Sequence, residues 1–348
     1  MSEGTTGAGR RRLQASTLSK WVGPGRLWLL LAGLVVAGAV SNDVFLTSRN
    51  LTNVMRQSIV LGIVAVGQTL VVLVRGIDIS VAATIAMANT TLMGVVAGES
   101  QRLPFGIGLA LAAGLVVGLT NGIATVAARV PPFIVTLGTA SIVTGITFLY
   151  TDQTSFGKPA PEMTQVGFAA IGPVPVLFFA YLGIALVALV IQNRTVFGRH
   201  LFAVGGSESI ARLSGVPARR VQLVAYAACG VLAAAAGVAM SMRMGAGEPL
   251  SGVGFEWDSV AAVVVGGTAL TGGQGGVAGT VLGVAVISIL NNVMNLMAVS
   301  SFAQIVVKGV IVVLAVLLSA ISVRWAAAGD VRTARRRILR GAESGGST

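Results

Sequence analysis

Long apolar runs follow one another along most of this sequence, and short polar or glycine-containing breaks separate them. A helix needs about 20 mostly apolar residues to cross the hydrocarbon core of a bilayer. Stretches that approach or reach this length cover approximately residues 27–46, 55–75, 79–98, 104–127, 132–150, 174–192, 221–241, 257–271, 277–297 and 303–323. The pattern predicts an all-α polytopic membrane protein with about ten transmembrane helices. Because of these breaks, the sequence does not define where the helices in the stretches 55–75, 79–98, 257–271 and 277–297 begin and end.

The composition is that of a membrane protein. Hydrophobic residues make up 54% of the 348 positions and charged residues only 10%, whereas about 25% of a typical soluble domain is charged. Mean hydropathy is +0.86. The 46 glycines suit helices in lipid, because small residues let neighbouring backbones approach closely.

The basic residues are distributed unevenly between the loops. If the N-terminus is cytoplasmic and the spans alternate, most of the 24 Lys and Arg lie inside. The exceptions are Arg49, Arg56, Arg102, Lys158 and Arg243 on the outer side, and Lys308 within the last span. The acidic residues lean the other way, with Asp43, Glu99, Asp152, Glu162, Glu248, Glu256 and Asp258 outside. This distribution follows the positive-inside rule, so we expect cytoplasmic N- and C-termini and an even span count.

Both ends of the chain differ from the middle. Residues 1–20 and 326–348 are rich in Ser, Gly, Thr and Arg, which predicts disordered basic tails around a transmembrane domain at 27–323. Arg10–Arg12, the apolar run 27–40 and Ala37-Gly38-Ala39 also resemble a secretory signal peptide. Cleavage there is the alternative, and it would leave the orientation of the other spans unchanged.

The sequence carries no sign of a metal site or a nucleotide site. Cys229 and His200 are the only residues of their kinds, and no cluster has metal-ligand spacing. A G-x-x-x-x-G-K-[ST] phosphate loop is missing, although residues 270–274 nearly spell the signature peptide of ABC ATPases. No paired Asp or Ser/His set marks an intramembrane enzyme. The pI of about 11.4 reflects loop charge sorted by side, not nucleic-acid binding. We expect no bound cofactor.

The longest cytoplasmic connection, residues 193–220, is predicted to contain a short helix. Ser207 is a suitable N-cap and Glu208 suits the first turn. Gly215 followed by Pro217 ends the helix. With apolar residues at 210 and 213, this helix reads as a docking element for a second protein. A solvated basic loop is the alternative.

Two further sets of polar residues are candidates for function. Asp78 lies between two spans with Arg75 as its expected partner, and the pair is either a gating element or a structural cap for the helix near Ser80. Neutral polar residues within the spans suit a hydroxyl-rich, uncharged solute, or else they are packing contacts between helices. The candidates for a translocation path are Gln68, Asn89, Asn121, Thr136, Thr139, Asn292 and Asn295. Lys308, only a turn or two into the last span, can snorkel.

Several stretches together resemble the membrane permease subunits of ABC importers for monosaccharides of the ribose/xylose/galactose type. These stretches are residues 66–70, 76–81, 121–122, 131–139, 198–217, 266–280 and 304–309. They span nearly the whole membrane domain in the expected order.

The resemblance implies a half-transporter in the inner membrane, built as two related halves. A second permease copy would complete the pathway, and a periplasmic or lipid-anchored sugar-binding protein would deliver the solute. A cytoplasmic ABC ATPase, which uses the ATP, would dock on the coupling loop. The residues implied there are Gly205, Gly206, Ser207, Glu208, Arg212 and Gly215.

Two other transport functions stay open at this point. A self-sufficient secondary transporter or channel would need ion-coupling carboxylates, for which Asp78 is the one candidate within the spans. A nucleoside or branched-chain amino-acid permease of an ABC importer is the nearer alternative. The sugar itself is not defined by the sequence, because specificity is expected to lie largely in the binding protein.

Overall fold

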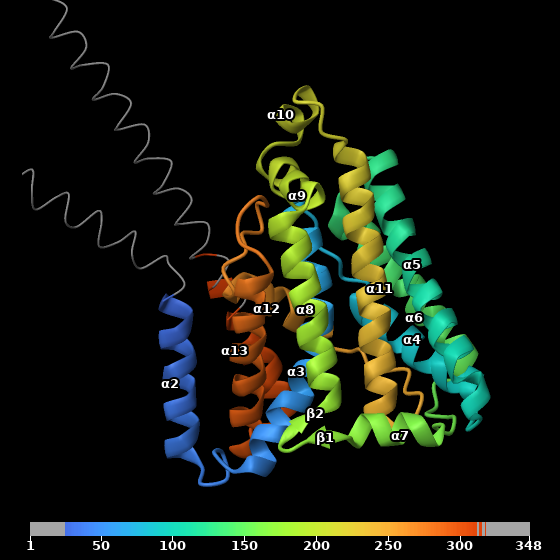
Figure 1. Ribbon diagram of the computed structural model, residues 1–348, viewed down its shortest axis with the longest axis vertical. Coiled ribbons are helices and arrows are strands. Elements are labelled where there is room, and N and C mark those ends of the chain that lie inside the picture. Colours follow the sequence, from blue (N-terminus) through green and yellow to red (C-terminus); the bar gives the residue numbers. More distant parts are fainter. Residues whose placement is uncertain (1–24, 312, 315–316, 318–348) are drawn as a thin grey trace, which may run out of the picture.

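The computed structural model describes residues 25–311, 313–314 and 317, and these residues form a bundle of helices (Figure 1). The tails predicted at 1–20 and 326–348 lie outside the described residues. The elements are α2 (Gly25–Ser41), α3 (Ser48–Leu73), α4 (Val81–Val96), η1 (Ser100–Arg102), α5 (Leu103–Ala127), α6 (Pro132–Thr151), α7 (Pro161–Phe168), β1 (Ala170–Ile171), β2 (Val174–Pro175), α8 (Val176–Arg194), α9 (Val196–Gly206), α10 (Glu208–Leu213), α11 (Ala218–Met244), α12 (Phe255–Val265) and α13 (Val277–Leu296). A further helical segment covers Ser301–Ile311.

Each of the ten apolar stretches contains one of these helices. In the part of the chain that the structure describes, six helices are long and apolar enough to cross a membrane: Ser48–Leu73, Ser100–Ala127, Pro132–Thr151, Val176–Arg194, Ala218–Met244 and Val277–Leu296. Shorter apolar helices occupy Leu27–Ser41, Val81–Val96 and Ser301–Ile311. The predicted polytopic helical membrane protein is therefore confirmed at this level.

Helix α3 forms the centre of the bundle. Its residues from Ser58 to Leu73 are all buried, because α11, α12, α13 and α8 pack around it. A helix that is apolar on every side suits either the centre of a bundle or contact with lipid, and the packing places α3 at the centre. The main hydrophobic cluster joins α3 to Tyr181 of α8, Tyr226 of α11 and Ile287 of α13.

Helices α5 and α11 approach each other through glycines. Gly114, Gly118 and Gly122 recur every fourth residue and so share one face of α5. A Cβ on Gly118 would overlap the Tyr226 carbonyl oxygen, and a Cβ on Gly114 would overlap that of Gly230. The close packing expected from the glycine content is confirmed here.

The eighth apolar stretch, 257–271, is not helical to its end. Helix α12 stops at Val265, and a glycine-rich loop follows before α13 begins at Val277. Gly267, Gly272 and Gly273 have φ values of 87°, 79° and 70°. These left-handed conformations end a helix, so α12 has 11 residues and is buried within the bundle.

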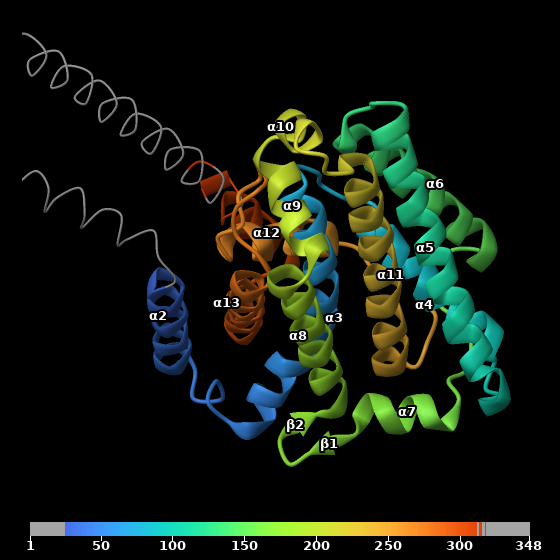
Figure 2. The same ribbon diagram turned by 45° about the horizontal axis from the view of Figure 1, so that its top comes forward.

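The connections gather at two opposite ends. In both views α7, β1 and β2 lie at one end of the bundle, and α9 and α10 lie at the other (Figure 1 and Figure 2). Helix α2 ends at the α7 end, where the Asn42 amide donates to the Leu296 carbonyl at 3.4 Å. The segment Ser301–Ile311 starts there too, immediately after α13. The described parts of α2 and of this last segment therefore both extend toward the α10 end.

Candidate functional site

The short helix expected in the coupling loop is present as α10. The Ser207 hydroxyl accepts from the Ile210 amide at 3.4 Å, as an N-cap does. Glu208 in the first turn pairs with Arg212, and Gly215, with a φ of 80°, follows the last turn. Of the apolar residues, Ala211 packs inward, whereas Ile210 is 65% exposed and Leu213 is 89% exposed. Helix α10 thus presents two exposed apolar side chains at the end of the bundle.

Arg75 is held by the coupling segment and not by Asp78. Its Nε donates to the Gly205 carbonyl at 2.7 Å, and a terminal nitrogen donates to the Gly206 carbonyl. The predicted Arg75–Asp78 pair is therefore wrong. Arg75 has a φ of 68° and lies just after α3, so its side chain reaches the C-terminal end of α9. Cations are favoured at that end of a helix.

The glycine-rich loop between α12 and α13 contacts the ends of α3 and α9 at the same place. The Gly273 amide donates to the Leu73 carbonyl at 3.0 Å. A Cβ on Gly205 would overlap the Leu73 carbonyl oxygen and the Gly273 amide nitrogen. Because it has no side chain, Gly205 allows this close approach of the backbones. Three segments thus meet through main-chain atoms: the end of α3, the end of α9, and the loop between α12 and α13.

A polar cleft of about 360 Å³ lies beside this junction. Arg75, Arg129 and Arg212 line it together with Glu208 and Gln222. The cleft is open, rich in cationic groups and next to α10. Its chemistry suits contact with a water-soluble partner or passage of a polar solute.

Asp78 is fully buried in a network of neutral groups. Its Oδ1 accepts from the Ser80 amide at 2.9 Å and the Ser80 hydroxyl at 2.6 Å, and the Asn121 amide lies 3.4 Å from both carboxylate oxygens. The Gln68 side chain, oriented with its nitrogen toward Asp78, donates to the Asp78 carbonyl oxygen at 3.2 Å. Its oxygen accepts from the Asp78 main-chain amide, also at 3.2 Å. Thr136 donates to the Ile77 carbonyl at 3.2 Å. These contacts fix the turn that leads into α4.

The other predicted path residues divide into buried and accessible ones. Asn89 is buried and bonds Ser241 at 2.9 Å, while its Oδ1 accepts from the Glu248 amide at 2.6 Å. Asn292 is buried in a reciprocal amide pair with Asn50 at 2.8 and 2.9 Å. Thr139 is half-buried, and Asn295 is exposed. The structure therefore brings Gln68, Asn121, Thr136 and Asp78 together and keeps Asn89 and Asn292 elsewhere.

A second polar cleft, of about 400 Å³, opens at the α7 end. Its lining residues are Asn50, Asn53, Arg56, Gln57, Arg243, Asn292, Asn295 and Leu296. Arg56 and Arg243 were not singled out from the sequence as functional. Both are arginines at the predicted outer side, which the positive-inside rule disfavours, and this exception is the signal that could have found them.

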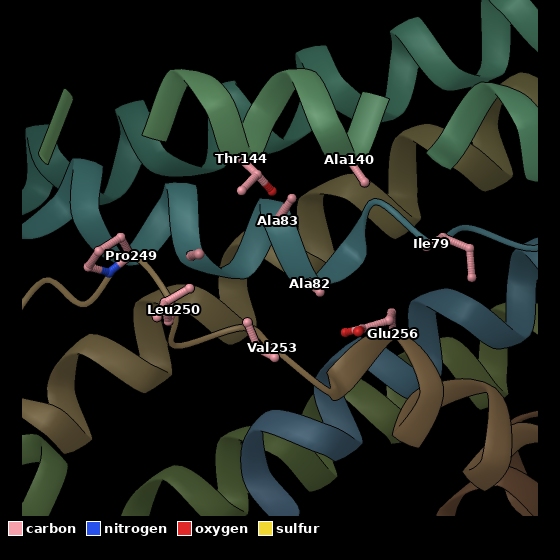
Figure 3. Close-up of a pocket in the computed structure, with 10 residues that line it drawn as sticks. Ile79, Ala82, Ala83, Ala140, Thr144, Pro249, Leu250, Val253 and Glu256 are labelled. Carbon is pink, nitrogen blue, oxygen red and sulfur yellow. The ribbon is translucent and has the colours of Figure 1, made fainter. Parts of the chain in front are cut away.

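A smaller cleft of about 170 Å³ lies between α4, α6 and the loop that leads into α12 (Figure 3). Its walls are mostly apolar, with Ala82 and Ala83 on α4 and Val253 on the loop. Glu256 is the acidic residue among them, and its Oε2 accepts from the Gly254 amide at 2.9 Å. Thr144 approaches from α6 (Figure 3). A half-buried carboxylate in an apolar cleft is a strong hydrogen-bond acceptor for a neutral solute.

Close to Glu256 lies an ion pair that the sequence reading missed. Lys308 donates to Asp258 Oδ2 at 2.9 Å, with only 22% and 10% of the two side chains exposed. Asn291 also reaches this oxygen at 3.4 Å. Lys308 therefore does not snorkel, and Asp258 is not a solvated outer charge, because each neutralises the other inside the bundle. Charged groups within apolar surroundings persist when paired.

Comparison with known proteins gives a consistent result. A family model described as branched-chain amino acid transport system / permease component matches residues 50–317. The chain is 37% identical over 319 residues to the ribose import permease protein RbsC of Bacillus subtilis, covering 89% of this chain and 95% of that protein. It is 35% identical to the D-allose transport system permease protein AlsC of Escherichia coli, with 86% and 91% covered. It is 30% identical to the xylose transport system permease protein XylH of Haemophilus influenzae, with 84% and 95% covered. No solved structure matches the chain.

Proposed function

This chain belongs to the family of the branched-chain amino acid transport system / permease component, and we propose that it is the membrane permease subunit of an ABC importer for a monosaccharide. The curated relatives that match most of its length are permeases for ribose, allose and xylose. They confirm the resemblance drawn from the residues. The chain is a multi-pass transport subunit and not an enzyme, because ATP hydrolysis in such importers belongs to a separate ATPase.

The observation that carries the proposal is the junction beneath α10. An exposed apolar helix lies at one end of the bundle, and Arg75 ties its base to the end of the central helix α3. The glycine-rich loop ties the same point to α12 and α13. A push on α10 is therefore transmitted directly to the buried helices. A secondary transporter docks no ATPase, so it does not require a connection of this kind between a surface helix and the buried helices.

The proposed placement has ten spans and cytoplasmic ends. The α10 end holds Arg75, Arg129, Arg194, Arg199, Arg212, Arg219 and Arg220. Fewer basic residues lie at the α7 end, which holds Arg49, Arg56, Arg102, Lys158 and Arg243. The excess supports a cytoplasmic α10 end, with the ATPase on α10 and a sugar-binding protein on the α7 end. We also propose that the chain pairs with a second permease copy, lies in the inner membrane and consists of two related halves.

The translocation path within this proposal connects the two polar clefts. We call the cleft at the α7 end the outer cleft and the one beside α10 the inner cleft. Asn295 and Asn292 border the outer cleft, and Thr136, Asn121 and Gln68 lie near the inner one. Neutral amides and hydroxyls can exchange hydrogen bonds with sugar hydroxyls without binding the solute tightly. The buried members reach the solute only if the helices move, as alternating access requires.

The test is uptake of labelled ribose into proteoliposomes of defined content. We expect accumulation when the chain is reconstituted with its ATPase, its binding protein and ATP. Omitting any one of these is expected to abolish it. Vigorous uptake by the chain alone would contradict the proposal and favour a self-sufficient transporter. ATP-dependent uptake of leucine in place of ribose would favour the branched-chain amino-acid alternative.

A further inference from the structure

A long apolar groove runs along the outside of the bundle between α8 and α11. It encloses about 830 Å³, and Leu70 of α3 and Leu115 of α5 contribute to its lining. Phe197, at the start of α9, lies at one end of it. All its lining residues are apolar. Because α8 and α11 are both candidate membrane spans, the groove faces the hydrocarbon region, and a polar solute would find no hydrogen-bond partner in it.

The α8 wall follows a single helical face. Its lining residues are Ala180, Gly183, Ile184, Val187, Ala188 and Ile191. They are three or four positions apart, so they form one continuous stripe. The α11 wall follows the same spacing from Val224 to Leu232.

Each of these two stripes continues into an arginine at the α10 end. Arg194 follows Ile191 by three positions, and Arg220 precedes Val224 by four, so each shares the groove-facing side of its helix. Both side chains are exposed. Neither hydrogen-bonds or pairs with an acidic group among the described residues. Two arginines therefore continue the two walls of the groove at the α10 ends of α8 and α11.

We propose that the groove between α8 and α11 is a binding site for an anionic glycerophospholipid. An acyl chain lies along the apolar stripe, and the headgroup phosphate lies between Arg194 and Arg220. Guanidinium groups bind phosphate oxygens bidentately, and basic residues at the ends of membrane helices recognise anionic headgroups. The site rests on the membrane placement proposed above and is independent of which solute is transported.

Titration of the full-length purified chain with lipid, followed by native mass spectrometry, tests the site. The probes are palmitoyl-oleoyl phosphatidylglycerol and phosphatidylcholine with the same chains. We expect preferential retention of phosphatidylglycerol. Changing Arg194→Ala and Arg220→Ala together should raise its apparent Kd about tenfold or more. The paired change Arg49→Ala and Arg129→Ala removes the same charge elsewhere and should leave the Kd unchanged.

A second variant tests the groove itself. Gly183 lines the groove, and a Cβ there meets nothing within 4 Å, so Gly183→Leu places its side chain in the groove and should prevent retention of the lipid. Gly145 of α6 is equally open, and Gly145→Leu is the matched control. Equal affinity for the two lipids, or unchanged phosphatidylglycerol binding in the arginine pair, would overturn the proposal. Cross-links from groove positions to a neighbouring helix of another subunit would also overturn it.

Discussion

Gly205 is a residue at which three backbone segments meet. Because a Cβ there would overlap the Leu73 carbonyl and the Gly273 amide, Gly205→Ala must push α9 away from α3. Overpacking of this kind costs about 1–3 kcal/mol. We expect a lower Tm for the purified protein and weaker coupling of ATP hydrolysis to uptake.

Gly206 supplies the matched control. A Cβ on Gly206 meets nothing within 4 Å, and alanine has a higher helix propensity than glycine by about 1 kcal/mol. Gly206→Ala should therefore keep or slightly raise the Tm. Equal losses in the two variants would show that the close approach at Gly205 does not matter.

Variants at Asn292 and Asn295 distinguish a role in packing from a role in transport at the outer cleft. Asn292→Ala leaves the buried Asn50 carbonyl oxygen without its partner, which costs about 1–3 kcal/mol, so we expect a lower Tm. Asn295 is exposed in the cleft, so Asn295→Ala should keep the Tm. If Asn295 lies on the path, ribose uptake should fall in this variant. Unchanged uptake with unchanged Tm would remove Asn295 from the path.

Sequence reading at this scale succeeded where partners are close along the chain. The Ser207 cap acts on Ile210, three residues away, and the turn at Gly215 is equally local. Lys308 and Asp258 are 50 positions apart, and only the packing of α12 against the last helical segment brings them together. Arg75 was paired with Asp78 because they are neighbours in sequence. The positive φ of Arg75 directs its side chain elsewhere.

At the scale of elements, the Lys308–Asp258 pair joins α12 to the last helical segment. Removing one partner of a buried pair leaves an uncompensated charge, at a cost of about 3–5 kcal/mol. Lys308→Gln and Asp258→Asn should each reduce the yield of folded protein in membranes. Exchange of the two residues, Asp258→Lys with Lys308→Asp, should recover part of it.

The Glu99–Arg102 pair is the control, because its side chains are 53% and 56% exposed. Exposed pairs contribute about 0–1 kcal/mol, so Arg102→Gln should leave the yield unchanged. An exchange variant at Asp258 and Lys308 that is no better than either single change would contradict a direct pairing.

Helix α10 offers a separate test of partner docking. Burying an apolar side chain contributes about 1.5–3 kcal/mol, so Ile210→Asp and Leu213→Asp should each weaken ATPase binding about tenfold or more. Co-purification of the ATPase measures this. Ile171→Asp, an exposed apolar position on β1 at the opposite end, should leave ATPase binding intact. Retention of the ATPase by both α10 variants would place the contact elsewhere.

The elements were largely predictable, because each span is a long apolar run with its own boundaries. Helix α12 was the exception, since residues 257–271 are apolar enough to continue the helix. The helix ends at Gly266 and the left-handed Gly267. Further along the loop, Gly272 and Gly273 lie against Gly205 and Gly206 of α9, and this contact cannot be read from the run alone. The clefts were not predictable, because they lie between helices that are distant in sequence.

For the whole molecule, the proposed placement puts α10 in the cytoplasm and α7 outside. Cys229 is fully buried, so the chain should show no background labelling by a membrane-impermeant maleimide. Ser209→Cys on α10 should react only in inside-out vesicles. Gln165→Cys on α7 should react in right-side-out preparations of the inner membrane. The reverse pattern would invert the topology and move the ATPase contact to the other end.

The junction of α3, α9 and the glycine-rich loop is built almost wholly from carbonyl and amide groups, with the Arg75 guanidinium added. These main-chain groups belong to residues outside α10, so the junction places no demand on the side chains of α10. In the proposed function, the helix that docks the ATPase and the junction that connects it to α3 are therefore separate parts of the chain. We therefore expect that residues 207–214 can be exchanged for those of another permease without disturbing the junction, so that the same membrane domain is matched to a different ATPase.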